Sequence, residues 1–415
     1  MPEIIAKYQP SSLNGYVEFK IPNISHPSFG KATISGRFPR IQPRFSRPEV
    51  DPKIISGLTT KFAELVAECG IGTDSFERVD VPTTIAGAIQ FTLYWNPTIT
   101  WDSKGFTFYV WFLIFGYFFD DALEDGWFAG RLNVKTVQYV HETYDKIIRM
   151  QAVEEELPGF EELPAFHGIC KKQGGIIFSN LPGCKEDEYH YWFAPGLKVL
   201  RRMVAAGVDF VGDDYVEYIE PFASAFQACF LNDDWFTCCR VDKRFSLGTY
   251  RAWRQGNAGC DVCLECQMFV CGIRVSQNVR RHPVFKRIIT IALTNVAWVN
   301  DIFGAGKDFS SAGNHPDNEI VFRVVEKGES IQDVVDNMCL LIEEELHDLI
   351  YMKQTLVDIF GEDESIRCFL EMVDVQIDGQ LMVYMENTRY KCNRGYVRIF
   401  RDADEKGKIE TVPSG

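Results

Sequence analysis

The sequence predicts an all-α fold, on the basis of three observations. From Pro52 onward, stretches with helical periodicity alternate with short loops rich in Gly, Pro or acidic residues, and strand signals are sparse. Residues 106–119 form an apolar, largely aromatic run. Residues 288–299 are mostly apolar and contain neither Pro nor Gly, so we expect a second long helix there.

The order of these stretches along the chain predicts three parts. Residues 1–52 hold much of the proline and show little helical periodicity, which predicts an irregular N-terminal arm folded over the core. Residues 53–400 carry the helical patterns. Residues 401–415 are polar, which predicts a disordered tail.

The aromatic run at 106–119 leads straight into a block of acids that begins with Asp120 and ends with Asp125. Clustered carboxylates at the end of an apolar helix are costly in a core unless a cation neutralises them. Mg²⁺ takes oxygen ligands and commonly shares them with substrate phosphates. This segment alone fits a buried helix capped by solvated acids equally well. It is too short for a membrane span before the acids begin.

A second polar segment follows the predicted helix at 288–299. Asn300, Gly304 and Asp308 are four residues apart and therefore share one helical face. The amide oxygen and the carboxylate can ligate a metal, and the neighbouring Lys307 can bind a phosphate. The two segments together predict a metal–diphosphate site.

These segments resemble the metal motifs of class I terpene synthases (terpene cyclases), of the type found in microbes, fungi and some marine invertebrates. Residues 120–124 match the DDxxE motif, and residues 300–308 match the NDxxSxxxE motif with two departures: glycine replaces serine and aspartate replaces glutamate. The resemblance implies a water in place of the missing hydroxyl, and Gly304→Ser is expected to preserve or increase metal affinity. The metal-binding positions that it implies are Asp120, Asp121, Glu124, Asn300, Gly304 and Asp308.

Two further features match the family. Arg254 lies 46 residues before Asn300, in a run whose two glycines and asparagine predict a helix break. The resemblance implies that Arg254 senses the diphosphate and that Asn257 and Ala258 lie in the kinked segment. A second set, implied to contact the diphosphate, comprises Lys307, Arg389 and Tyr390.

The resemblance covers roughly residues 60–395 and implies a single class I helical bundle over 53–400 with a central active-site cavity. The implied enzyme is a Mg²⁺-dependent cyclase that ionises an isoprenyl diphosphate, with three Mg²⁺ ions and Mn²⁺ as an alternative metal. We expect geranylgeranyl diphosphate as substrate, with farnesyl diphosphate second. Because aromatic faces stabilise carbocations, the candidate cavity residues are Phe115, Phe119 and Trp298.

Two other functions stay open on the sequence. A chain-elongating isoprenyl diphosphate synthase shares the metal chemistry, but its resemblance would require a second aspartate-rich motif late in the chain. A non-catalytic lipid- or metal-binding helical protein could keep the fold while the residues at 304 and 308 abolish turnover.

Two other patterns could be mistaken for metal sites. Residues 213–217 also read DDxxE, but Gly212 predicts a helix start, where acids suit the helix dipole without a metal. The cysteines at 260, 263, 266 and 271 lie among apolar residues, which predicts packing rather than a metal site.

Composition excludes several partners. A net charge of −15 argues against nucleic acid and anionic membranes. The thirteen cysteines are scattered and residues 1–20 show no signal-peptide pattern, so we expect a cytoplasmic protein without disulfides. We expect no membrane span, and a homodimer stays open.

Overall fold

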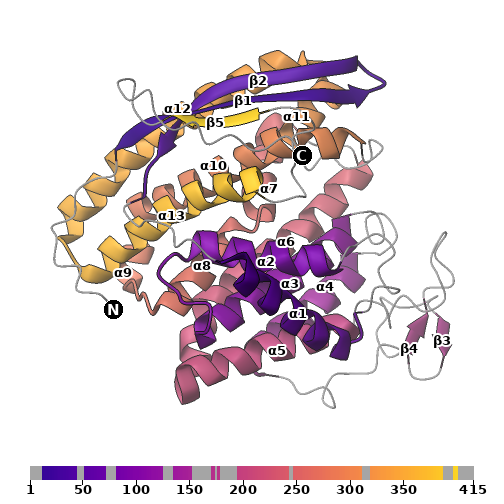
Figure 1. Ribbon diagram of the computed structural model, residues 1–415, viewed down its shortest axis with the longest axis vertical. Coiled ribbons are helices and arrows are strands. Elements are labelled where there is room, and N and C mark those ends of the chain that lie inside the picture. The colour runs from indigo at the N-terminus through magenta and orange to yellow at the C-terminus, as the bar shows by residue number, and fades with distance from the viewer. Residues whose placement is uncertain are drawn as a thin grey trace. The chain divides into compact units, whose positions relative to one another are not determined.

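The computed structural model in Figure 1 describes residues 12–43, 51–71, 81–124, 134–151, 170–172, 175–177, 194–242, 246–310, 318–386 and 396–400. For residues 119–124 it describes the backbone. The long helices in these ranges are α1 Pro52–Glu68, α2 Val81–Trp95, α3 Lys104–Glu124, α4 Val134–Ile148, α5 Ala194–Val211, α6 Tyr215–Asp242, α7 Leu247–Asn257, α8 Cys260–Cys271, α10 Pro283–Ser310, α12 Ile331–Phe360 and α13 Glu364–Glu386. The shorter elements are α9 Gln277–Arg280, α11 Glu319–Val321, a π-helical turn Phe322–Glu326, and the strands β1 Leu13–His26, β2 Gly30–Ile41, β3 Cys170–Lys172, β4 Gly175–Ile177 and β5 Tyr396–Phe400. The predicted all-α class is confirmed.

The chain divides into two compact units. Unit 1 comprises Met1–Arg47, Leu247–Leu264 and Gly272–Gly415, and unit 2 comprises Pro48–Ser246 and Glu265–Cys271. The expected single domain over 53–400 and its central cavity stay predictions.

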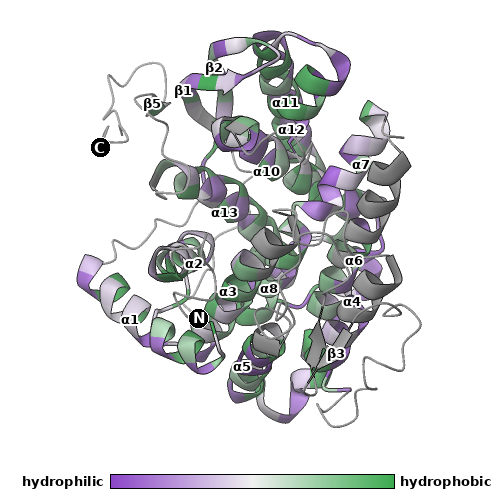
Figure 2. Ribbon diagram, turned by 90° about the vertical axis from the view of Figure 1, so that its right-hand side faces the viewer, coloured by the Kyte–Doolittle hydropathy of each residue, from purple (hydrophilic) through white to green (hydrophobic). Residues whose placement is uncertain are grey.

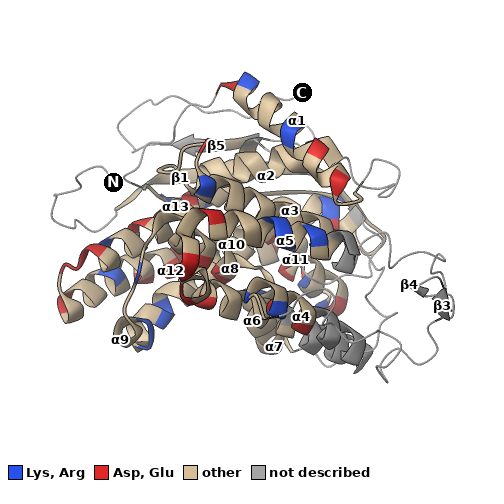
Figure 3. Ribbon diagram, turned by 90° about the horizontal axis from the view of Figure 1, so that it is seen from below, with Lys and Arg blue, Asp and Glu red and all other residues tan. Residues whose placement is uncertain are grey.

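Unit 2 is built around α3, which contains the predicted aromatic helix. Phe108 of α3 packs against Phe222 and Phe269, with ring centroids 5.7 and 4.7 Å apart. Gly207 of α5 allows the close approach of this ring, because a Cβ there would lie 3.0 Å from Phe108 and 2.5 Å from Tyr215. The adjacent α2 carries no charged residue and is tan throughout in Figure 3, as a core helix should be. Helices α1 and α5 show both hydrophilic and hydrophobic colours in Figure 2, which fits one buried and one solvent-facing side.

Unit 1 is built around α10, the second predicted helix, which packs against α7, α12 and α13. Within the described part of the chain it is the one helix long and apolar enough to cross a membrane. Its apolar window is 83% buried inside the protein, which is how a core helix behaves. The helix therefore carries the second motif through the interior of unit 1.

The expectation of an irregular arm over 1–52 is wrong for residues 13–41. These residues form the hairpin β1–β2, and β5 pairs with the other edge of β1 to give an antiparallel sheet in the order β2-β1-β5. Val17, Phe19 and Ile21 are buried and alternate with more exposed residues, which is the two-residue period of a half-buried strand. This alternation is visible in the sequence, whereas the prolines nearby favour an irregular segment. The predicted domain boundary at residue 52 therefore separates β1 and β2 from β5, although the three strands belong to one sheet.

The sheet covers α10 and α12 and supports the segment of α10 that carries the second motif (Figure 1). Phe19 of β1 contacts Phe303 edge-on at 5.5 Å between ring centroids. At the hairpin turn, Phe29 contacts Phe309 edge-on at 5.1 Å. Gly36 of β2 leaves room for Phe19, whose ring would be 2.7 Å from a Cβ at that position. The tail at 401–415 lies outside the described residues.

We predict that Phe19→Ala lowers the free energy of unfolding by about 3–5 kcal/mol, because it removes a fully buried ring that packs on α10. The neighbouring Lys20 is exposed, so Lys20→Ala should change the free energy by no more than about 0.5 kcal/mol. Denaturant unfolding of both variants measures the difference. Equal, small effects would show that the hairpin is a dispensable attachment.

Candidate metal and diphosphate site

Helix α10 brings the three positions of the second motif together. A Cβ built on Gly304 would lie 3.8 Å from Asn300 Oδ1 and 2.8 Å from Asp308 Oδ2. Two oxygen donors therefore border the small space beside this glycine. The spacing of four residues accounts for this, since it returns each side chain to the same face of the helix.

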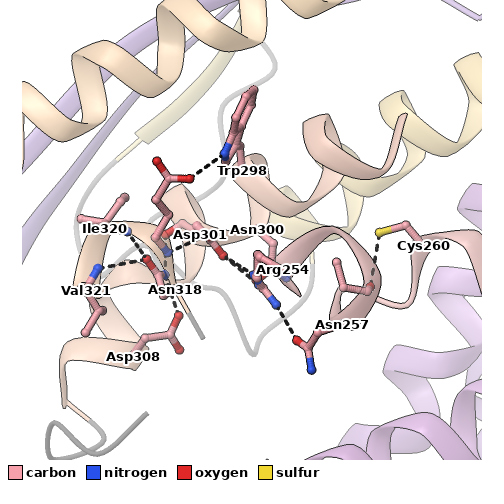
Figure 4. Close-up of polar contacts among 12 residues, drawn as sticks. Arg254, Asn257, Cys260, Trp298, Asn300, Asp301, Asp308, Asn318, Ile320 and Val321 are labelled. Carbon is pink, nitrogen blue, oxygen red and sulfur yellow. Dashed lines mark hydrogen bonds and ion pairs between the residues drawn. The ribbon is translucent and has the colours of Figure 1, made fainter. Parts of the chain in front are cut away.

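Arg254 reaches this face from α7. Its Nη2 donates to Asn300 Oδ1 at 3.1 Å, and its Nη1 donates to Asn257 Oδ1 at 3.0 Å (Figure 4). The predicted helix break follows at once, because α7 ends at Asn257 and Gly259 has a φ of +63° before α8 begins. The fold thus places the predicted sensor arginine and the second motif within hydrogen-bond distance. Ala258 lies in the turn, where its carbonyl accepts from Cys260 Sγ at 3.3 Å.

Asp301 is the main partner of Arg254, a role that its sequence neighbours do not predict. Arg254 donates to Asp301 Oδ1 from Nε at 3.1 Å and from Nη2 at 2.7 Å. The other oxygen, Oδ2, accepts from the backbone N–H of Glu319 at 2.7 Å. The side chain is fully buried. Burial raises the pKa of Asp301 to about 7, although Arg254 and the Glu319 amide act to lower it. The position of Asp301 in the sequence could have indicated this role. A carboxylate one residue after Asn300 points to a different side of an apolar helix, where it needs a cation as partner.

Asn318 bonds to Asp308, the last residue of the second motif. Its Nδ2 donates to Asp308 Oδ2 at 2.8 Å and to the backbone oxygen of Asp301 at 2.7 Å. Its Oδ1 accepts from the backbone N–H groups of Ile320 and Val321 and so caps α11 (Figure 4). The residue is buried. Sequence reasoning missed it, since an asparagine before a short helix indicates a cap and nothing more.

Asn300 is held on its other side by α13. Its Nδ2 donates to the hydroxyl of Tyr384 at 2.5 Å, and Gln380 also donates to that hydroxyl. The ring of Tyr384 stacks on Phe303, with centroids 5.6 Å apart. With Nδ2 occupied in this way, Oδ1 of Asn300 faces Arg254.

Trp298, a predicted cavity residue, is buried next to this network. Its Nε1 donates to Glu319 Oε2 at 2.9 Å. Arg251 binds the same carboxylate through Nε and Nη2, at 3.0 and 2.6 Å, and its guanidinium lies 5.5 Å from the indole ring centre. Arg251 therefore forms a bidentate ion pair with Glu319. A contact of Trp298 with substrate stays a prediction.

The remaining predicted residues fall into three groups. Lys307 is exposed on α10. Phe115 is buried in unit 2, edge-on to Tyr144 at 5.1 Å, and its contact with substrate stays a prediction. The backbone of α3 continues through the first motif to residue 124. Those whose side chains lie outside the described residues are Phe119, Asp120, Asp121, Glu124, Arg389 and Tyr390.

Both competing patterns lie within the described residues. Gly212 has a φ of +71° and starts a short turn that leads into α6, with Asp213 and Asp214 exposed. Cys260 is buried, and its backbone oxygen accepts from Gln376 at 2.6 Å. Among the described residues, no group of three or more His, Cys, Asp or Glu side chains is arranged to hold a metal ion.

The donors beside Gly304 fit a hard divalent cation. Asn300 Oδ1 and Asp308 Oδ2 are an amide and a carboxylate oxygen, which are the ligand types that Mg²⁺ takes. Mg²⁺ commonly completes its shell with water and substrate phosphates, so two protein oxygens are sufficient for one ion.

Comparison with known proteins agrees with this site. Residues 181–348 match the family described as "Terpene synthase family 2, C-terminal metal binding", a range that contains Arg254 and the second motif. The chain is 27% identical to a (3S,6E)-nerolidol synthase of Selaginella moellendorffii over 29% of this chain and 33% of that protein. It is also 27% identical to a germacrene A synthase of Nostoc punctiforme, over 35% of this chain and 44% of that protein. Over these parts of its length, the chain is similar to terpene synthases.

Solved structures confirm the class I terpene synthase fold. A cucumene synthase variant superposes with a TM-score of 0.58 at 14% identity and covers 84% of this chain and all of its own. A hedycaryol synthase gives 0.55 at 16% identity and covers 84% of this chain and 98% of its own. The resemblance stated from the motifs is therefore confirmed. The matches to curated relatives span between a third and a half of the relatives' length.

We predict that Asp301→Asn lowers the free energy of unfolding by about 1–3 kcal/mol, because the new amide N–H groups must face either Arg254 or the Glu319 amide. Asp209→Asn is the matched control. Asp209 binds Lys104 at 2.8 Å in an exposed pair, so its loss should cost less than about 1 kcal/mol. Denaturant unfolding compares the two. Equal stability of both variants would mean that Asp301 does not organise the site.

Proposed function

We propose that the protein is a Mg²⁺-dependent terpene cyclase that ionises an isoprenyl diphosphate and cyclises the resulting carbocation. The observation that carries the proposal is that Asn300 and Asp308 lie beside Gly304 and that Arg254 bonds to Asn300. Two oxygen donors suited to a cation stand beside an arginine suited to a phosphate. On a chain with a net charge of −15, an anionic diphosphate needs such cationic partners.

The metal, when bound, supplies charge stabilisation to the departing diphosphate. Asn300 and Asp308 would hold one ion at the described site. The proposed ligands on α3 are Asp120, Asp121 and Glu124. Lys307, Arg389 and Tyr390 are proposed to bind the diphosphate oxygens.

Arg254 is proposed to change partners on binding. In this structure its Nη2 contacts Asn300 Oδ1, the same oxygen that we propose as a metal ligand. A guanidinium carries five N–H donors in a planar fork, so it can keep Asp301 while it releases Asn300 and binds a phosphate oxygen. Asp301 would then hold the arginine in place in both states.

The substrate belongs to the isoprenyl diphosphates, and farnesyl diphosphate has the better support. Two relatives from Postia placenta, each 24% identical over 35% of this chain, are named sesquiterpene synthases. Geranylgeranyl diphosphate, favoured on the sequence, is the alternative. We also propose a cytoplasmic location, since the thirteen cysteines favour a reducing compartment.

We predict that the purified protein, incubated with Mg²⁺ and farnesyl or geranylgeranyl diphosphate, releases pyrophosphate and forms a cyclic terpene. Gas chromatography with mass spectrometry identifies the product. Asp120→Asn should lower turnover roughly 100-fold, equivalent to about 3 kcal/mol of lost charge stabilisation. Asp213→Asn, in the exposed second DDxxE pattern, is the matched control and should remain active.

Other outcomes of these experiments would indicate a different function or a different position of the first metal site. Product that forms only when isopentenyl diphosphate is added identifies a chain-elongating synthase. Tight binding of the diphosphate without release of pyrophosphate identifies a non-catalytic binding protein. Loss of activity in Asp213→Asn but not in Asp120→Asn would move the first metal site to the turn before α6.

A further inference from the structure

Two buried glutamines of α13, Gln376 and Gln380, each carry an unsatisfied side-chain oxygen. Gln376 is fully buried, and Gln380 is 6% exposed. No group in the described part of the chain donates a hydrogen bond to Oε1 of either side chain. Buried amide oxygens are costly to leave without a donor, and proteins commonly satisfy them with an ordered water. Because the two residues are four apart, they share one face of α13.

The orientation of the Gln376 amide is fixed by its other end. Its Nε2 donates to the backbone oxygen of Cys260 at 2.6 Å. Turning the amide over would place two oxygens against each other, so Oε1 is the atom that needs a donor. Gln380 has a similar arrangement, in which Nε2 donates to the hydroxyl of Tyr384 and Oε1 is left for another donor.

Hydrogen bonds connect both amides to the proposed diphosphate site within unit 1. Cys260, which Gln376 binds, is the first residue of α8 and directly follows the helix break. Tyr384, which Gln380 binds, also accepts from Asn300 at 2.5 Å, and Asn300 is a proposed metal ligand (Figure 4). A ligand of the two amides would therefore lie close to the place where the proposed reaction releases its diphosphate.

The chemistry of the unsatisfied atoms selects the ligand. Both are neutral acceptors, so the ligand must be a hydrogen-bond donor, which excludes an isoprenyl chain. A metal ion would need carboxylates, but the nearest acids along α13 are in ion pairs: Asp374 with Lys353, and Asp378 with Arg40 at 2.6 Å. A water molecule, which donates two hydrogens, satisfies both amides at once.

We infer that Gln376 and Gln380 hold a water molecule that adds to the carbocation, so that the product is a terpene alcohol. This inference rests on the proposed function and specifies its product. A water that donates one hydrogen to each amide presents its lone pairs on the side away from α13. One lone pair forms the C–O bond to the cationic carbon, and the resulting oxonium ion passes a proton to the released pyrophosphate. The two glutamines are positioning residues that act through this water.

The water itself can be tested without activity. Crystal structures of the full chain with Mg²⁺ and inorganic pyrophosphate, for the wild type and for Gln376→Leu, would locate it. We expect a water about 2.7–3.2 Å from Gln376 Oε1 in the wild type and no water at this place in the variant. A wild-type Oε1 that is dry, or that a protein group satisfies, would overturn the inference whether or not the enzyme is active.

The capture step is tested by incubating the protein with Mg²⁺ and an isoprenyl diphosphate in ¹⁸O-labelled water. The wild type should form an alcohol that carries one ¹⁸O. Gln376→Leu and Gln380→Leu should each lower the ratio of alcohol to hydrocarbon about 10-fold, because the water loses its position while ionisation continues. Gln354→Leu is the matched control and should keep the ratio, since Gln354 binds Asp358 at 2.8 Å in an exposed pair on α12.

Thermal unfolding checks that the variants fold, and Gln380→Leu carries the test if loss of the bond to Cys260 unfolds Gln376→Leu. A wild type that forms only hydrocarbon, an alcohol without ¹⁸O, or an unchanged ratio in a folded variant would overturn the inference while the proposed function stands. If no isoprenyl diphosphate yields pyrophosphate, the proposed function fails and the capture step fails with it, even where the crystal structure shows the water.

Discussion

The site depends on one buried carboxylate. Asp301 lies inside unit 1, where a charge without a partner would cost several kcal/mol. Its two oxygens are satisfied from two directions, by Arg254 of α7 and by the backbone of Glu319 at the start of α11. Satisfying this single group therefore brings together three segments that are distant in sequence. Arg254 and Asn318, which both bond to Asp301, also contact the second motif at Asn300 and Asp308.

Side chains on different faces of α10 have different partners. Asn300 and Asp308 border the space beside Gly304, whereas Phe303 and Phe309 face the sheet. The β1–β2 hairpin thus packs behind the helix that carries the proposed ligands. A ligand set needs a rigid support, because small displacements of donor atoms weaken metal binding strongly. The β1–β2 hairpin, which lies in the segment predicted to be irregular, therefore contributes to the stability of the site.

The parts of the fold that could be predicted are those encoded locally. The aromatic helix at 106–119, the apolar helix at 288–299, the break after Arg254 and the helix start at Gly212 all follow from periodicity and from glycine. The sheet could not be predicted in the same way, because β1 pairs with β5 from the other end of the chain. Asp301 and Asn318 were missed for a related reason. Their roles come from partners in other segments, such as Arg254 and Asp308, rather than from their own neighbours in sequence.

The most direct test of this account is a crystal structure with Mn²⁺ and pyrophosphate, in which anomalous scattering locates each metal. The account predicts a Mn²⁺ ion bound by Asn300 Oδ1 and a carboxylate oxygen of Asp308. It also predicts that Arg254 keeps its bond to Asp301 while it leaves Asn300 for the pyrophosphate. A metal bound without contact to Asn300 and Asp308, or an Arg254 that still donates to Asn300 Oδ1, would contradict it.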